Sequence, residues 1–405
     1  MMFLAILLAA AVNTAPQEAP EYLEDWKEGY FDIHAISTGK GESTFYIFPD
    51  GTTMLCDAGD MTGYNWPSTP YPDDSMTPAQ WIARYIKHFS KRDTVDYFLL
   101  SHFHDDHMGS DFAFRPGQHG YELCGITEVG EYIHFDKIVD RGYPDYDFPS
   151  KEVARELPTS RYVENYIKFV GYQHDCMGSD VEQFRVATHS QFTLKNSPKA
   201  YDFDIWNVAG NARIARKVLP GSRPMYGKKD DLRQFDENMF SCVQLIRYGD
   251  FYYYHGGDVP GTYWNQDDPK PFSRAFEAQI ADRIGHGVDV MKANHHGTQD
   301  ASTYGFLEKM RPNAVIFLCA VAGHPSYPTI RRMLDPQLPG SKLLFATTDV
   351  SEQHLAETWK DMQPWGHIVV RVYDGGKRYR IFVLDATSKD YRIKFSSPEF
   401  KVVVK

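Results

Sequence analysis

Short apolar runs alternate along the chain with polar turns and with amphipathic helix patterns. Two stretches with apolar residues three or four positions apart predict helices, at 77–89 and 271–284. Thr77 is the expected N-cap of the first, with Pro78 at its first helical position. Strand-like runs are expected at 31–36, 44–48, 52–56, 97–101, 288–293 and 315–318, and as hairpins at 243–254 and 367–384. Strands alternating with helices predict a layered α/β domain, rather than a helical bundle or an all-β sandwich.

The first fifteen residues form an apolar stretch that is too short to span a bilayer comfortably and ends in small residues. We interpret 1–15 as a cleaved signal peptide and therefore expect export; an uncleaved anchor is the alternative. No other apolar segment is long enough for a membrane span. Residues 29–405 are predicted to be a single domain, with an insertion at 143–200 that could cap a cleft and a C-terminal β-hairpin extension at 366–405.

Composition excludes few classes of protein. The chain has 405 residues, of which 42% are hydrophobic and 24% charged, as is ordinary for a soluble globular protein. Its net charge of −11 disfavours broad, non-specific binding of nucleic acid, which needs a basic face, but allows a local basic patch. The five cysteines include no C-x-x-C pair, so neither a zinc knuckle nor a disulfide framework is indicated.

A six-residue cluster, His102-Phe103-His104-Asp105-Asp106-His107, directly follows the apolar run at 97–101. Imidazole and carboxylate groups are the usual ligands of hydrolytic zinc. His102 and His104 are two positions apart and point the same way if the strand continues. Asp106 and His107 follow on a turn and can reach a second ion. The cluster therefore predicts the beginning of a two-metal site.

Other polar groups follow apolar strands in the same manner. Asp57, Asp258 and the pair His295-His296 each come directly after a strand-like run. Because α/β sheets build their sites where neighbouring strands end, these groups are expected to converge with the histidine cluster.

With these residues the chain resembles the metallo-β-lactamase fold superfamily. The resemblance is closest to the soluble hydrolase domain at the C-terminus of bacterial competence DNA-uptake channels, although no channel accompanies it here. Its motifs are 39–42, 49–59, 102–107, 238–258 and 288–297, extended by 323–325 and 348–349. The resemblance implies a four-layer αβ-βα sandwich with a dinuclear zinc site along one edge; Mn²⁺ is the alternative metal.

The resemblance also implies roles for individual residues. His102 and His104 would bind the first ion, and Asp258 would bridge both. The second ion would be bound by Asp106, His107 and one of the later pair, with His296 preferred and His295 facing the substrate. Asp57 would orient ligands through hydrogen bonds.

One position departs from the superfamily pattern. A further histidine ligand of the first ion is expected where this chain has Asn211, which is a poor zinc ligand. His189 or His174 could replace it, the first ion could be completed by water, or only the second position could be occupied.

Two zinc ions can deprotonate a water, and the zinc-bound hydroxide would attack an ester, amide or phosphodiester. We expect three catalytic residues. Asp106 is one, and His295 and His324 would serve as proton donors or oxyanion contacts. His324 could equally be a structural turn residue before Pro325.

The basic stretch 213–233 would suit a substrate that bears phosphate, although it could also be a solvated loop. We therefore expect phosphodiester hydrolysis, of nucleic acid or of a phosphocholine-like ester. The net negative charge of the chain slightly favours a small substrate over duplex DNA. The alternatives are a β-lactam or lactone hydrolase and a non-catalytic binding module on a degenerate hydrolase scaffold.

Overall fold

The computed structural model describes residues 21–63, 70–149, 160–228, 230–232, 235–261, 276–318, 324–339, 343–349 and 362–405. The predicted signal peptide at 1–15 and the first part of the helix predicted at 271–284 lie outside these residues. None of the described helices is long and apolar enough to cross a membrane.

The larger of two sheets has the strand order β17-β16-β15-β1-β2-β3-β4-β5-β6, and β18 pairs with β16. The strands on its N-terminal side run antiparallel from β1 to β3 and parallel from β3 to β6. The strands are β1 (Phe31–Ala35), β2 (Thr44–Ile47), β3 (Thr53–Cys56), β4 (Thr94–Leu99), β5 (His134–Asp140), β6 (Asp180–Gln183), β15 (His367–Tyr373), β16 (Arg378–Leu384), β17 (Ile393–Ser396) and β18 (Phe400–Lys401).

The second sheet has the order β14-β13-β12-β11-β10-β7-β8-β9. Its strands from β11 to β14 run parallel, and those from β9 to β11 form an antiparallel half. They are β7 (Phe203–Gly210), β8 (Arg213–Ala215), β9 (Ser222–Pro224), β10 (Val243–Tyr248), β11 (Phe251–His255), β12 (Val290–Lys292), β13 (Ala314–Phe317) and β14 (Leu343–Ala346).

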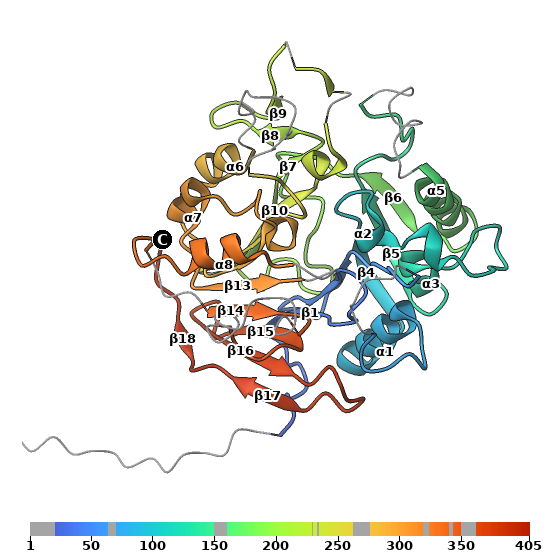
Figure 1. Cartoon of the computed structure of the whole chain (residues 1–405), viewed down its shortest axis with the longest axis horizontal. Coiled ribbons are helices and arrows are strands. Elements are labelled where there is room, and N and C mark those ends of the chain that lie inside the picture. The colour runs from blue at the N-terminus through green and yellow to red at the C-terminus, as the bar shows by residue number, and fades with distance from the viewer. Residues whose placement is uncertain are drawn as a thin grey trace, which may run out of the picture.

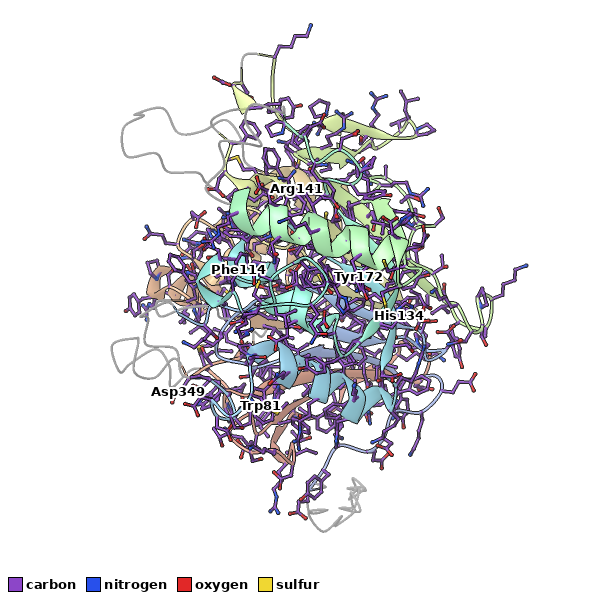
Figure 2. The ribbon with its side chains drawn as sticks, turned by 90° about the vertical axis from the view of Figure 1, so that its right-hand side faces the viewer. Trp81, Phe114, His134, Arg141, Tyr172 and Asp349 are labelled. Carbon is purple, nitrogen blue, oxygen red and sulfur yellow. The ribbon has the colours of Figure 1, made fainter. Side chains whose placement is uncertain are left out.

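Helices cover the outer face of each sheet (Figure 1). The first sheet is covered by α1 (Pro78–Ser90), α3 (Gly125–Val129) and α5 (Ser160–Asp175), and α5 with Tyr172 faces the viewer in Figure 2. The second sheet is covered by α6 (Phe276–Ile284), α7 (Tyr304–Met310) and α8 (Tyr327–Met333). Short turns of helix are α2 (Asp105–Met108), η1 (Asp111–Ala113), η3 (Glu237–Phe240) and η4 (Asn294–Gly297).

Three apolar cores separate the four layers, and alternation along the strands assigns residues to them. In β1, Phe31, Ile33 and Ala35 face the core between the two sheets. The outer cores pack α1, α3 and α5 on the first sheet and α6, α7 and α8 on the second. The molecule is therefore a four-layer αβ-βα sandwich, which confirms the predicted layer order.

Most of the elements predicted from the sequence are present. Helix α1 begins after Thr77, whose side chain accepts a hydrogen bond from the Gln80 backbone in a capping box. Strands β10 and β11 form the predicted hairpin, and α6 accounts for the described part of the second predicted helix.

The predicted insertion and the predicted C-terminal extension both contribute strands to the first sheet. Residues 160–183 of the expected insertion form α5 and β6, and β6 extends the sheet by pairing in parallel with β5. Whether 143–200 caps a cleft stays a prediction. The C-terminal hairpin of β15 and β16 forms as expected, but β15 also pairs with β1, so the hairpin lies inside the sheet rather than beyond it.

Candidate metal centre

Polar groups from four strand ends meet at one edge of the sandwich. Asp57 follows β3, the histidine cluster follows β4, Asp258 follows β11 and the pair His295-His296 follows β12. The loop between β1 and β2 adds Glu42. Ligating atoms of four buried residues lie within 4.8 Å of one another: Glu42, His107, Asp258 and His296. The convergence that the sequence predicts is thus present in the structure.

One ring nitrogen of His296 contacts two carboxylates. Its Nε2 lies 2.9 Å from a carboxylate oxygen of Asp106 and 2.9 Å from one of Asp258. Its Nδ1 donates a hydrogen bond of 2.6 Å to the Leu318 carbonyl. Burial opposes a charge on this ring, but the carboxylates of Asp258 and Asp106 hold the pKa of His296 well above its usual range. A positive charge is therefore favoured between the carboxylates of Asp106 and Asp258, where His296 lies.

His107 is oriented by a hydrogen bond to Asp57, the residue to which the resemblance gives this role. Its Nδ1 donates to Asp57 Oδ2 over 2.8 Å, which directs its Nε2 towards Asp258 Oδ2 at 3.1 Å. The backbone N–H and the hydroxyl of Ser101 both donate to the Asp57 carboxylate, each over 2.7 Å. Carboxylates hold metal-binding imidazoles in this manner.

His102 and His104 form the other side of the cluster. His102 Nε2 lies 3.1 Å from His104 Nδ1 and 3.9 Å from Asp258 Oδ2. The same Asp258 oxygen also lies 3.1 Å from His107 Nε2 and 2.9 Å from His296 Nε2, so three imidazoles surround it. This is the position that a bridging carboxylate requires.

The residues fit a bound divalent metal. The Nε2 atoms of His107 and His296 lie 3.4 Å apart, and each ring already donates from Nδ1, to Asp57 and to the Leu318 carbonyl. In the neutral imidazoles the two Nε2 lone pairs would therefore face each other in a buried space. A cation between them relieves this repulsion, and the donor set of imidazoles and carboxylates is one that zinc accepts.

Two buried residues of the centre, Glu42 and Lys292, were not predicted as site residues. Lys292 is fully buried and donates to the Gly257 carbonyl over 2.6 Å and to Asp258 Oδ1 over 3.0 Å. Its Nζ also lies 3.1 Å from Glu42 Oε2. Lys292 therefore occupies one oxygen of Asp258 and leaves the other free to face the histidines.

Both residues stand in motifs that the sequence analysis singled out, 39–42 and 288–297. A lysine inside an apolar strand was the available signal for the second. Glu42 comes to the centre through a contact between distant loops, since its backbone N–H donates to the Asp106 carbonyl over 2.8 Å.

Asn211 is held by another residue. Its Oδ1 accepts from Arg141 over 3.3 Å, and its Nδ2 donates to the Arg141 carbonyl over 2.8 Å. Arg141 itself is buried, forms an ion pair with Glu237 through two hydrogen bonds, and lies over the rings of Phe103 and Phe240. A charged network occupies the position where the superfamily pattern expects the further histidine.

Neither histidine considered as a replacement reaches the centre. His189 has a side chain that is 57% exposed, with Nδ1 2.8 Å from Asp204, and its ring stacks on Trp206. His174 lies at the end of α5, is also exposed, and pairs with Asp175. Each of these exposed histidines pairs through Nδ1 with a neighbouring carboxylate, and neither contacts a residue of the cluster among the contacts described.

His295 and His324 flank the cluster differently. His295 Nε2 lies 3.2 Å from Asn238 Nδ2, and its Nδ1 lies 3.3 Å from Asp300. His324 stacks on His296 with ring centres 5.1 Å apart. Burial, with repulsion from His296, lowers the pKa of His324 to about 3, so its ring is neutral.

The turn that carries the histidine pair has an unusual backbone. His295 and His296 adopt left-handed conformations, with φ of 46° and 51°, and Gly297 follows with φ of 79°. Such strain in side-chain-bearing residues is concentrated at functional sites. At Gly297 a side chain is also excluded by space, because a Cβ would lie 2.6 Å from the Phe317 ring.

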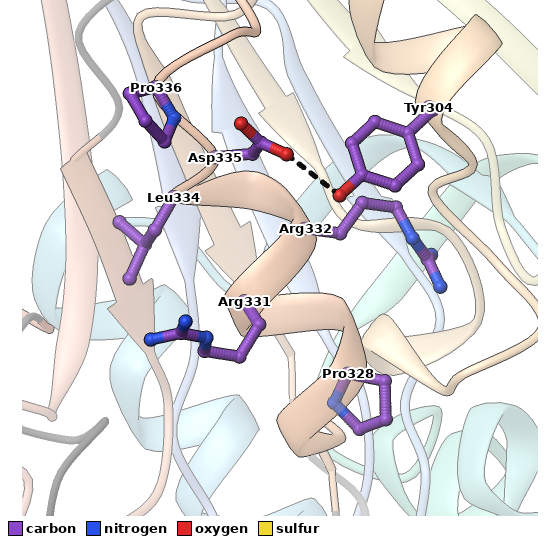
Figure 3. Close-up of a pocket in the computed structure, with 7 residues that line it drawn as sticks. All are labelled: Tyr304, Pro328, Arg331, Arg332, Leu334, Asp335 and Pro336. Carbon is purple, nitrogen blue, oxygen red and sulfur yellow. Dashed lines mark hydrogen bonds between the residues drawn. The ribbon is translucent and has the colours of Figure 1, made fainter.

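A separate groove of about 710 Å³ lies on the outer side of α8 (Figure 3). The Tyr304 hydroxyl donates to Asp335 across it, over 2.9 Å. The lining residues are Tyr304, Pro328, Arg331, Arg332, Leu334, Asp335 and Pro336. Because none of these is a predicted ligand, the groove is distinct from the centre.

Comparisons with known proteins gave matches among solved structures alone. No protein-family model and no curated protein matches the chain. Similar structures include CmlA, a diiron β-hydroxylase from Streptomyces venezuelae (TM-score 0.37, 13% identity, 80% of this chain), of which the match covers 53%. Yeast PDE1 (0.31, 11%, 84% and 98% of the two chains) and Zn²⁺-bound PqqB from Methylobacterium extorquens (0.32, 9%, 71% and 88%) are also similar.

Proposed function

We propose that this protein is a metal-dependent hydrolase that cleaves phosphodiester bonds. The observation that carries the proposal is the arrangement around Asp258 Oδ2, which faces His102 at 3.9 Å, His107 at 3.1 Å and His296 at 2.9 Å. His102, His104 and Asp258 would hold one zinc ion. Asp106, His107, His296 and the shared Asp258 would hold the other, with Glu42 beside it. Bound there, zinc would supply an activated water and a Lewis acid for the substrate oxygens.

The protein's own residues supply orientation and proton transfer. Lys292 and Asp57 fix Asp258 and His107 through the contacts given above. Of the two candidate proton donors, we assign His295, because its Nδ1 faces the Asp300 carboxylate and its side chain is 24% exposed towards solvent. His324 stacks on a ligand ring and is assigned to shaping the site.

The choice of a phosphodiester rests on charge. Residues 211–228 contain five arginine and lysine residues and no carboxylate, and they leave the sheet directly beside the Arg141–Asn211 contact. Such a surface attracts an anionic substrate. The sequence resemblance to the competence-channel hydrolase domain also favours this class.

The test is hydrolysis of bis(p-nitrophenyl) phosphate by zinc-loaded protein. We expect Asp258→Ala and His104→Ala each to lower kcat/KM at least a hundredfold, because the metal contributes several kcal/mol to the transition state. His189→Ala, which removes an exposed histidine outside the cluster, should stay within twofold. Equal activity of Asp258→Ala and the unaltered protein would contradict the proposal. Hydrolysis of nitrocefin without hydrolysis of the phosphodiester would favour a β-lactam hydrolase instead.

A further inference from the structure

The β8–β9 hairpin projects from one end of the molecule in both whole-chain views (Figures 1 and 2). Arg213 pairs with Pro224 and Ala215 with Ser222, and the tip is closed by a backbone hydrogen bond of 3.0 Å from Arg216 to Gly221. All six residues of the tip, 216–221, are exposed.

The hairpin is firmly attached to the sandwich. Ala212, Ile214 and Met225 at its base are buried in the core beneath α6. Arg283 of α6 donates to the Ala215 carbonyl over 2.9 Å. The tip is therefore presented on a fixed support.

The apex of this tip is apolar. Val218 is 92% exposed and Leu219 is 62% exposed, and Pro220 follows them. Two adjacent large apolar side chains held this far into solvent are costly unless a partner covers them.

Cations surround the apex. The five positive residues of 211–228 stand in a chain of net charge −11, and no ion pair to a carboxylate is present for any of them within the described residues. Arg213 donates to Ser222, and Arg223 donates to Gln279 and to the Pro224 carbonyl. These residues are Arg213, Arg216, Lys217, Arg223 and Lys228.

We propose that the β8–β9 hairpin docks this protein on an anionic lipid surface. Val218 and Leu219 enter the boundary between headgroups and acyl chains, while Arg216, Lys217 and Arg223 bind headgroup phosphates. A nucleic acid partner is disfavoured, because bases stack on aromatic side chains and the apex has none.

Docking would bring the metal centre close to the membrane. Arg141, bonded to Asn211 at the hairpin base, bridges to Glu237, which accepts a hydrogen bond from the Phe103 backbone between His102 and His104. A strand of three residues, about 10 Å, separates this base from the tip. On the proposed function, the substrate would then be a phosphodiester held at the membrane. The docking itself does not depend on that function.

The experiment is sedimentation of the protein with vesicles of phosphatidylcholine, with and without phosphatidylglycerol. We expect binding only to the anionic vesicles. Arg216→Glu with Lys217→Glu should weaken it at least tenfold, since each cation contributes about fivefold. Val218→Asp with Leu219→Asp should also weaken it at least tenfold. The matched surface changes Lys377→Glu and Val403→Asp should stay within twofold.

Three results would overturn the proposal. They are equal binding to both kinds of vesicle, unchanged binding of the apex variant, and retention of a single-stranded oligonucleotide in place of vesicles. Thermal unfolding of each variant identifies any loss that arises from misfolding. If the zinc-loaded unaltered protein binds anionic vesicles but does not hydrolyse bis(p-nitrophenyl) phosphate, the proposed function is contradicted and the docking proposal stands.

Discussion

At the scale of single residues, the buried Lys292 is the group on which the geometry of the centre depends most. It neutralises Asp258 and Glu42, from which its Nζ lies 3.0 and 3.1 Å. Burial opposes its charge, yet these two carboxylates raise its pKa, so the lysine is charged. It thereby leaves one defined Asp258 oxygen facing the histidines.

Lys292→Met should therefore lower the stability of the metal-free protein by about 3–5 kcal/mol, because two buried carboxylates lose their cation. Urea unfolding monitored by circular dichroism measures the change. Lys309→Met removes a lysine from an exposed pair with Asp282 and should cost at most about 1 kcal/mol. Equal losses in the two variants would show that Lys292 does not neutralise the centre.

The sequence predicts single residues well where several ligands are close along the chain. The cluster at 102–107 is recognisable because its spacing alone brings imidazoles together. Glu42 and Lys292 are recognised less easily, because each meets the cluster only through the packing of two distant loops and strands. The pairing of Asn211 with Arg141 is invisible in the sequence for the same reason, since seventy positions separate them.

At the scale of elements, helix α6 fixes the turn that carries His295 and His296. The buried carboxylate of Glu277 accepts hydrogen bonds from Asn294 Nδ2 over 2.7 Å and from the backbone of Ser302 and Thr303 over 2.6 and 2.9 Å. These donors lie at the two ends of the segment 294–303. One side chain thus holds both ends of the strained histidine turn.

Glu277→Gln should weaken zinc binding at least tenfold while the fold persists, because an amide N–H would face the donors and release one end of the turn. Asp50→Asn is the matched control, since Asp50 also accepts from three backbone N–H groups, of Thr52, Asn196 and Ser197. A competition titration with a zinc chelator measures the affinity. Equal zinc affinity in the two variants would show that zinc binding does not depend on the hold of Glu277 on the histidine turn.

A clear apolar period identified several elements, and two strands that lack one were missed. Helix α1 and the β10–β11 hairpin have regular apolar spacing and local turn signals. Strand β5 (His134–Asp140) interleaves charged residues, and β14 (Leu343–Ala346) is only four residues long. Their pairing with β4 and with β13 supplies the regularity that their own sequences lack.

At the scale of the whole molecule, two sheets bring the ends of β3, β4, β11 and β12 to one edge. The sequence predicts a layered α/β domain, because strand-like runs alternate with helix patterns, and the resemblance implies the four layers. It does not predict that 160–183 and the C-terminal hairpin join the first sheet, because strand order depends on long-range pairing.

The most direct test of the metal centre is elemental analysis of the purified protein, run beside Asp258→Ala and His189→Ala. We predict close to two zinc ions per chain in the unaltered protein and in His189→Ala, and a loss of both from Asp258→Ala, because its carboxylate faces both groups of histidines. A purified chain without bound metal, or an Asp258→Ala variant with its metal intact, would contradict the assignment of this cluster as the metal centre.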